Sequence, residues 1–262
     1  MNKEPFFSII IATYNAECEI VVTINSLDSQ TFNSYELIII DGSSTDNTVS
    51  EVNKHSKKIS YFVSEKDRGV FDAWNKGLKQ TRADWIIFLG AGDILLPKAL
   101  EGYHKLLKNI PYTDIDYCSS RIIALYDNKA NIIGQQYNWK VFRKYMNVAH
   151  VGSVHSKLIF EKNGFFNDNY KLAGDYELLL RSKENLTAKF LNEITVLMPM
   201  DGQSNRVSKV LSESYHAKIT SGGQNKFKSY LYYLYSFFIM KVKNYFYYNS
   251  NFDKRGKVNL HE

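Results

Sequence analysis

Four short apolar runs alternate with helical patterns along the first hundred residues, and this alternation most constrains the fold. The runs are rich in β-branched residues, as expected of strands that are covered on both faces. Polar turn residues and then apolar residues at helical spacing follow the runs. We expect the four strands at 6–12, 36–40, 59–63 and 85–89, with a helix at 70–80 before the last. This order is typical of an open, mostly parallel α/β sheet that binds ligands at the carboxyl ends of its strands.

The second half of the chain has a looser pattern, which predicts mixed α+β structure forming the other wall of the ligand crevice. Helices are expected at 98–108, at 157–162 and around 176–181. Strands are expected at 116–125, 131–133, 148–154 and 190–198.

The charge distribution separates the last 48 residues from the rest. The whole net charge of +6 falls in 215–262, where basic residues alternate with Tyr and Phe, so the remaining body is neutral. We therefore expect a boundary near residue 215. The body, 1–214, has the length of one large domain, which we divide at residue 97 into a first and a second half.

Several classes of protein are excluded by what the sequence lacks. Two cysteines, Cys18 and Cys118, cannot form a disulfide framework and fit a reducing cytoplasm. We find no secretory signal pattern and no apolar run long enough to span a bilayer. Motifs for a P-loop, a CxxC zinc site, a zinc protease and an α/β-hydrolase are also missing.

The loops after the four predicted strands carry residues suited to hold a ligand. They contain Thr13-Tyr14-Asn15, Asp41-Gly42-Ser43-Ser44, Asp67-Arg68-Gly69 and Gly90-Ala91-Gly92-Asp93. Asp93 directly follows a buried strand, where a carboxylate is costly unless it pairs, accepts hydrogen bonds or holds a cation. It either meets a diphosphate and a hard metal ion or caps the turn before Ile94.

Five ordered motifs give the sequence a family resemblance. The motifs SIIIATYNA, ELIIIDGSSTDNT, SEKDRGVFDAWNKGL, ADWIIFLGAGDILLP and AGDYELLLR resemble the family 2 inverting glycosyltransferases of the GT-A fold, and the match covers roughly 6–205. The resemblance implies a nucleoside-diphosphate sugar donor and a glycan or lipid-linked saccharide acceptor in bacterial surface-polysaccharide assembly. It makes 1–97 the donor half and 98–214 the acceptor half.

The resemblance also implies which residues contact the donor. The positions expected at the base and ribose are Thr13, Tyr14, Asn15 and Asp41, and those expected near the rest of the donor are Asp67, Arg68, Asp72 and Gly92. A tyrosine ring can stack on a base, a carboxylate can accept from a base N–H or ribose hydroxyl, and Arg68 can meet phosphate oxygens. Asp72 also lies four residues before Lys76, so the two can instead form a helix-surface pair.

The metal and the catalytic base are implied in the same way. The family's metal motif offers two acids, and here Gly92 replaces one, which leaves Asp93 as the expected ligand of Mg²⁺ or Mn²⁺ and puts the affinity of the site in doubt. Asp175 matches the family's base, although its position before a helical pattern equally suits an N-cap. Glu177 is the fallback base and otherwise a solvated helix residue.

The resemblance leaves the histidines and the tail open. We expect His155 to touch the acceptor and His150 to be structural, on opposite faces of a strand. The segment 226–248 is suited to lie on an anionic membrane, at the cytoplasmic inner face, or else to pack on the body as a helix. Because the body is neutral, we expect no nucleic-acid partner.

Two other functions remain open. One is a non-catalytic nucleotide-sugar-binding or scaffold subunit, because Gly92 breaks the acidic pair. The other is a sugar nucleotidyltransferase, for which the first strand lacks a following glycine-rich, basic loop.

Overall fold

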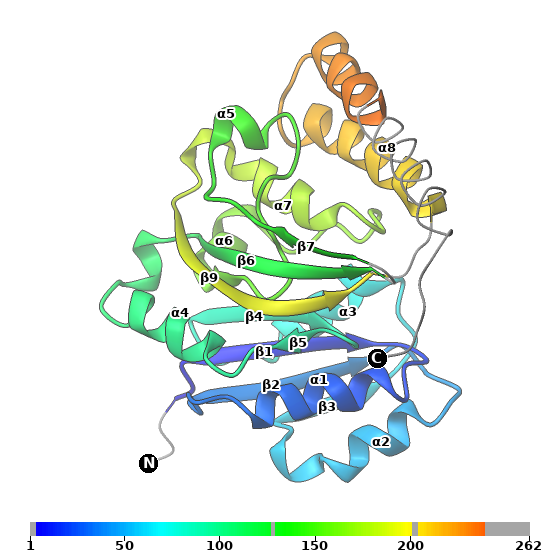
Figure 1. Cartoon of the computed structure of the whole chain (residues 1–262), viewed down its shortest axis with the longest axis vertical. Helices are drawn as coiled ribbons and strands as arrows, with labels where there is room; N and C mark the ends of the chain where they lie inside the picture. The colour runs from blue at the N-terminus through cyan, green and yellow to red at the C-terminus, as the bar shows by residue number, and fades with distance from the viewer. Residues whose placement is uncertain (1–3, 127–128, 201–203, 239–262) are drawn as a thin grey trace, which may run out of the picture.

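A single mixed sheet with helices on both faces organises the computed structural model, which describes residues 4–126, 129–200 and 204–238 (Figure 1). The strands are β1 (Phe7–Thr13), β2 (Tyr35–Asp41), β3 (Tyr61–Ser64), β4 (Trp85–Gly90), β5 (Ile94–Leu95), β6 (Tyr117–Tyr126), β7 (Lys129–Ile133), β8 (Val154–Ser156) and β9 (Ala188–Pro199). The helices are α1 (Glu19–Asp28), α2 (Thr48–Lys54), α3 (Val70–Leu78), α4 (Ala99–Leu107), α5 (Trp139–Phe142), α6 (Lys157–Asn163), α7 (Gly174–Ser182) and α8 (Ser204–Thr220), and residues 226–238 are also helical.

The strand order confirms the predicted parallel half and shows how the second half joins it. The order is β3-β2-β1-β4-β8-β6-β9-β5, with β7 paired to β6, and β1 to β4 are mutually parallel. β8 pairs antiparallel with both β4 and β6, while β9 runs parallel to β6. One sheet therefore continues from the first half of the chain into the second.

Both faces of the parallel strands are buried, which explains their unbroken apolar sequences. Ile9 and Ile11 pack with α1 and α4 on one face, whereas Ile10 packs with α3 and α7 on the other. Because side chains alternate across a strand, a strand that is covered twice needs apolar residues at every position.

The predicted strand at 148–154 is wrong. Residues 148–153 form a turn and β8 begins at Val154. Gly152 has a φ of +66°, and a Cβ there would lie 2.2 Å from the Val196 Cγ2 methyl. The chain reverses here because only glycine fits this backbone against β9. The elements β5, α5 and α8 were not predicted from the sequence, and the expected boundary at residue 215 falls inside α8.

The described part of the tail forms a helix that packs on α8. The rings of Tyr230 and Tyr233 lie 6.4 and 6.2 Å from that of Tyr215, and the Lys218 ammonium lies 5.9 Å from the Tyr232 ring. The helix therefore contacts the body over part of its surface, but it does not bury its aromatic side chains as the packing alternative expects, since Phe227 and Tyr235 are 71% and 62% exposed. The rest of the predicted interfacial segment, 239–248, lies outside the described residues. Among the helices of the described ranges, none is both long and apolar enough to cross a membrane.

Candidate active site

The loops after β1, β2, β3 and β4 meet at one edge of the sheet, as expected. The Gly42 N–H donates to the Thr13 carbonyl at 2.9 Å, the Glu65 N–H to the Asp41 carbonyl at 2.9 Å, and the Ala91 N–H to the Ala12 carbonyl at 3.2 Å. These bonds extend the parallel ladders beyond the strand ends, so residues distant in sequence lie side by side.

Asp41 holds the loop after β2 in place through hydrogen bonds to its side chain. It is fully buried, and its carboxylate accepts hydrogen bonds from the Ser44 N–H, the Ser44 hydroxyl and the Ser64 hydroxyl at 2.9, 2.5 and 2.6 Å. Three hydrogen bonds compensate its burial. Asp41 therefore shapes the β2 loop rather than presenting its carboxylate at the surface.

Asn15 and Ser44 join the first loop to the second. The Asn15 N–H donates to the Ser44 hydroxyl and the Asn15 side-chain oxygen accepts from the Thr45 N–H, both at 2.8 Å. Asn15 adopts a positive φ of 45°, which asparagine tolerates. Ser44 was expected only as part of the ligand-binding loop 41–44, and its contact with Asn15 was not foreseen, although a serine three residues after an aspartate is a recognisable local turn.

Tyr14 and Asp67 lie close together around the buried Gly42. Tyr14 is 62% exposed, and a Cβ built on Gly42 would lie 2.7 Å from Asp67 Oδ2 and 3.3 Å from Tyr14 Cδ2. The other oxygen, Asp67 Oδ1, accepts from the Gly69 N–H at 2.8 Å. Beside them, the buried Thr13 hydroxyl is without a hydrogen-bond partner among the described residues. An exposed ring, a carboxylate oxygen and an unused hydroxyl suit a flat, polar heterocycle.

Arg68 and Asp72 belong to a cluster of charges that ties α3 to the segment before α7. The Arg68 guanidinium pairs with Asp72, at 3.2 Å, and with Asp168. The Lys171 ammonium donates to the carbonyls of Arg68 and Asp168 at 2.7 Å. Burial alone would raise the pKa of Asp72, but the hydrogen bonds from Arg68 outweigh it and lower that pKa. The expected Asp72 pair with Lys76 is present at 4.0 Å.

Asp93 caps the turn after β4. Its Oδ2 accepts from the Gly90 N–H at 2.7 Å, and burial raises the pKa of the carboxyl to about 7. Gly92 has a φ of +99°, a backbone conformation that disfavours any side chain in place of the missing acid. The turn-capping alternative is therefore confirmed for one oxygen, and Oδ1 is the atom left for a cation.

A divalent cation would find only part of its ligand set here. Among the described residues no three His, Cys, Asp or Glu side chains are grouped so as to hold a metal ion. Mg²⁺ and Mn²⁺ prefer several oxygen ligands. Asp93 therefore fits a metal whose remaining ligands come from a bound diphosphate and water, and does not fit an all-protein metal site.

Asp175 lies in the first turn of α7, half-buried, with its Oδ1 accepting from the Tyr176 N–H at 2.7 Å. The N-cap is Ala173, so the prediction that Asp175 caps the helix is wrong. Burial raises the pKa of Asp175 to about 6, opposed by the Tyr176 N–H and aided by the negative charge of Glu213. A carboxylate with a pKa near neutrality is suited to accept a proton. A Cβ on the preceding Gly174 would meet the Phe71 ring at 2.7 Å, so α7 begins directly against α3.

Glu177 is neither solvated nor free. It is 3% exposed and accepts from the Arg181 guanidinium at 2.9 and 2.5 Å and from the Ser221 hydroxyl at 2.5 Å. Glu177, the fallback base, thus forms a structural ion pair with Arg181, and the expectation that its side chain is solvated is wrong.

His150 and His155 lie in the core. They are 5% and 0% exposed, and their ring centroids are 4.8 Å apart, among Trp74, Phe88 and Phe160. Burial lowers the pKa of His150 to about 3 and that of His155 well below its usual value. The two rings share one region because the chain turns at Gly152, so the opposite-face expectation is wrong. The structure buries His155 away from any surface on which an acceptor would rest.

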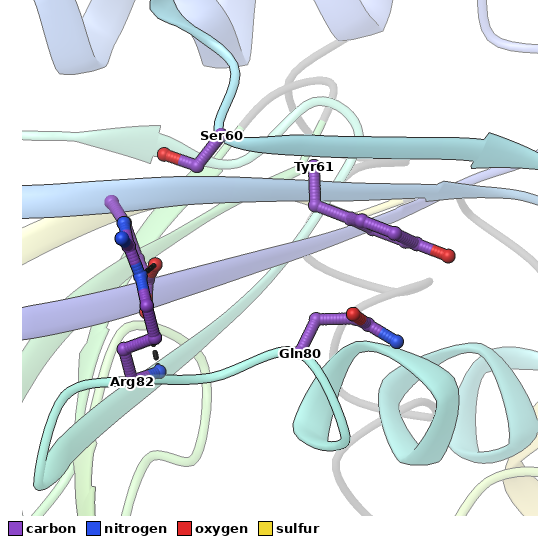
Figure 2. A pocket seen from close by; sticks show the side chains of 5 residues that line it. Ser60, Tyr61, Gln80 and Arg82 are labelled. Carbon is purple, nitrogen blue, oxygen red and sulfur yellow. Dashed lines mark hydrogen bonds and ion pairs between the residues drawn. The ribbon is translucent and has the colours of Figure 1, made fainter.

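A polar pocket also opens at the other end of the parallel strands (Figure 2). Glu36 lies at its base and accepts from the Ser8 hydroxyl at 2.6 Å and from the Arg82 N–H and Nε at 2.7 Å. Ser60, Tyr61 and Gln80 complete its lining. It is remote from the residues above because it surrounds the first residues of β2 and β3, and its charges are paired internally.

Comparison of sequences connects the chain with sugar transfer. A family model described as glycosyl transferase family 2 matches residues 8–162. Chondroitin synthase of Escherichia coli is 25% identical over 229 residues, covering 84% of this chain and 33% of that protein. The PGL/p-HBAD biosynthesis glycosyltransferase of Mycobacterium bovis is 26% identical over 191 residues, covering 69% of this chain and 71% of that protein. The chain thus spans only a third of the synthase.

Solved structures share the fold. The mannosyltransferase PcManGT of Pyrobaculum calidifontis, in complex with GDP-Man and Mn²⁺, matches with a TM-score of 0.66 and 15% identity, covering 88% of this chain and 70% of that one. S. aureus TarS 1-349 in complex with UDP-GlcNAc matches with a TM-score of 0.64 and 16% identity, covering 85% and 69%. The architecture described above is therefore the GT-A type of these two proteins.

Proposed function

Because the chain belongs to glycosyl transferase family 2, a family of sugar-transferring enzymes, we propose that it moves one sugar from a nucleoside diphosphate to an acceptor hydroxyl. Transfer inverts the configuration at the anomeric carbon. The observation that carries this proposal is Asp175, a half-buried carboxylate with a pKa of about 6, at the start of a helix that packs against α3. The segment 67–72, which we expect near the donor, leads into α3.

The donor nucleotide is expected to bind at the edge formed by the first three loops. The Tyr14 ring stacks on the base, while Asp67 Oδ2 and the Thr13 hydroxyl bond to its polar edge or to the ribose. Asp41 and Asn15 act indirectly, since their side chains fix the loops that carry these groups. Arg68 contacts the diphosphate if it exchanges a carboxylate partner for phosphate oxygens.

Asp175 is the general base. Its carboxylate takes the proton of the acceptor hydroxyl as that oxygen attacks the anomeric carbon from the side opposite the diphosphate. One new bond to the acceptor oxygen replaces the bond to the departing diphosphate, and a single displacement inverts the configuration. At neutral pH Asp175 is mainly ionised and ready to accept a proton.

Asp93 is the residue that would hold Mg²⁺ or Mn²⁺ together with the diphosphate. The chemistry that such an ion supplies when bound is neutralisation of the charge that develops on the leaving nucleoside diphosphate. The Asp93 carboxylate remains fixed by the Gly90 N–H, so its free oxygen is preorganised toward the donor.

The acceptor is a glycan or a lipid-linked saccharide, in bacterial cell-surface polysaccharide assembly. The names of the relatives support this class, since one is a chondroitin synthase and another is a glycosyltransferase of PGL/p-HBAD biosynthesis.

The test is release of nucleoside diphosphate from UDP-, GDP- and dTDP-sugars, assayed with and without a lipid extract as acceptor. Release from one nucleotide class, increased by the extract, is the expected result. Pyrophosphate release from a sugar phosphate and a nucleoside triphosphate would instead favour a nucleotidyltransferase, and nucleotide binding without turnover would favour a scaffold subunit.

We further propose that the helix at 226–238 holds the enzyme on an anionic membrane at the inner face of the cell. One face of this helix carries large apolar side chains exposed by 42% to 71%, at helical spacing. We call this face the aromatic stripe, formed by Phe227, Tyr230, Leu231, Leu234, Tyr235 and Phe238. Exposed Lys226 and Lys228 lie beside it, and the following sequence adds Lys241 and Lys243 among further aromatics. Apolar side chains with adjacent lysines match the boundary between acyl chains and anionic headgroups.

Replacing three residues of the aromatic stripe is expected to release the protein from vesicles. In Phe227→Ser/Leu231→Ser/Leu234→Ser, co-flotation with phosphatidylcholine vesicles containing phosphatidylglycerol should fall by about tenfold or more, because buried apolar area supplies much of the binding free energy. Ile132→Ser/Ile133→Ser removes exposed apolar area from β7 and serves as the control. Equal flotation of the triple variant and the wild type would remove the stripe from membrane binding.

A further inference from the structure

Glu213 of α8 holds the start of α7. Its carboxylate accepts hydrogen bonds from three successive backbone N–H groups: Lys171 at 3.1 Å, Leu172 at 2.8 Å and Ala173 at 2.9 Å. Figure 1 shows α8 lying alongside α7. Glu213 is 40 residues beyond Ala173, so this contact is entirely a product of the tertiary fold.

The contact anchors the segment directly before α7, which begins at Gly174. Lys171, Leu172 and Ala173 precede the helix, so Glu213 holds the chain as it enters α7 and does not bond to the free N–H groups of the first turn. The N-cap, Ala173, has no side chain that could accept from those groups. A carboxylate beside a helix N-terminus also interacts favourably with the helix dipole. α8 therefore supplies both an anchor and a negative charge at the start of α7.

Asp175 lies only two residues after Ala173. The residues around Ala173 also contact the segment 68–71. The Lys171 ammonium donates to the Arg68 carbonyl, and Gly174 packs against the Phe71 ring. The carboxylate of Glu213 thus fixes the backbone directly before Gly174 and Asp175.

We propose that Glu213 is a positioning residue for the catalytic base: it fixes the 171–173 backbone so that Asp175 meets the acceptor hydroxyl in a productive orientation. This inference rests on the proposed role of Asp175 as the base. A displacement of about 1 Å at a catalytic group can cost on the order of 10²-fold in rate, so this contact matters for turnover as well as for folding.

The charge of Glu213 also acts on Asp175. The described ionisable groups that interact with Asp175 across elements are Glu213 from α8 and Tyr117 from β6. Lys171, which precedes α7, directs its ammonium to backbone carbonyls. A neighbouring negative charge disfavours ionisation and so raises the pKa of Asp175, and neutralising Glu213 should lower it.

The experiment uses Glu213→Gln and Glu213→Ala, with Glu161→Gln, an exposed acid of α6, as the control for loss of one negative charge. The pKa of Asp175 is measured by ¹³C NMR on protein labelled at the aspartate carboxyl carbons, with the signal assigned by its loss in Asp175→Asn. Glu213→Gln should lower this pKa and shift the acid limb of the kcat/KM profile to lower pH, and Glu161→Gln should change neither. Glu213→Ala should reduce kcat by about 10- to 100-fold with little change in KM for the donor.

Two failures are distinguishable. An unchanged pKa of Asp175 in Glu213→Gln, together with wild-type kcat in folded Glu213→Ala, would make Glu213 a purely structural anchor and overturn the inference alone. Turnover by Asp175→Asn at the wild-type rate would overturn the proposed base itself. If Glu213→Ala does not fold, Glu213→Gln decides the matter, because glutamine offers one uncharged oxygen where two carboxylate oxygens accept from three N–H groups. Wild-type kcat and an unchanged Asp175 pKa in Glu213→Gln would then overturn the inference.

Discussion

Asp175→Asn is expected to lower sugar transfer by about 10²- to 10⁴-fold while leaving nucleotide binding unchanged. Asparagine keeps the oxygen that accepts from the Tyr176 N–H but cannot take up the acceptor proton at neutral pH. The measurement is kcat for release of nucleoside diphosphate in the presence of acceptor, compared with the dissociation constant for the free nucleotide. In the wild type, kcat/KM should fall as the pH drops below about 6, because the base is then protonated.

Stability supplies the control for this variant. The pKa of Asp175 is raised on folding from its ordinary value to about 6, so its contribution to the free energy of unfolding is fully present below pH 3.8 and is lost as the pH rises through 6. Asp175→Asn should therefore melt at pH 7 no lower than the wild type. An inactive variant that melts much earlier would point to misfolding, and wild-type turnover would exclude Asp175 as the base.

Asp93→Asn is expected to abolish the metal dependence of nucleotide binding and to weaken binding in Mn²⁺ by about 100-fold, or about 2.7 kcal/mol. The amide oxygen can still accept from the Gly90 N–H, so the turn survives, whereas the charge that would hold a hard cation is lost. The measurement is calorimetric titration of the nucleotide with and without Mn²⁺.

Glu19→Gln is the matched control for that experiment. Glu19 is an exposed acid of α1 whose stem would lie 3.7 Å from a Cβ at Gly92, so it is the same charge change beside the same turn. We expect it to retain metal-dependent binding. If Asp93→Asn retains that dependence while Glu19→Gln loses it, Asp93 is not the metal ligand.

The parallel half of the fold could be predicted because its signal is local. Ile9, Ile10 and Ile11 are all buried, two facing one layer of helices and one facing the other, so the strand is apolar throughout. The clustering of the loops that follow these strands could be predicted as well, since parallel strands bring their carboxyl ends to one edge of the sheet.

The remaining features depend on contacts between distant segments. β8 has three residues, and it is a strand because β4 and β6 flank it, which no local pattern around His155 indicates. The burial of His150 follows from the turn at Gly152, and the role of Asp41 follows from Ser44 and Ser64. Glu213 could not be found from sequence, because its three partners lie about 40 residues away and are backbone groups.

The most direct measurement is calorimetric titration of the full chain with UDP, GDP and dTDP, each with and without Mn²⁺, repeated on Gly42→Ala. The alanine methyl would lie 2.7 Å from Asp67 Oδ2 and 3.3 Å from the Tyr14 ring, where the base is expected. The account predicts that one nucleotide binds, that Mn²⁺ strengthens it, and that Gly42→Ala weakens it by about tenfold or more. Binding of no nucleotide under any condition, or binding that Gly42→Ala leaves unchanged, would contradict the account.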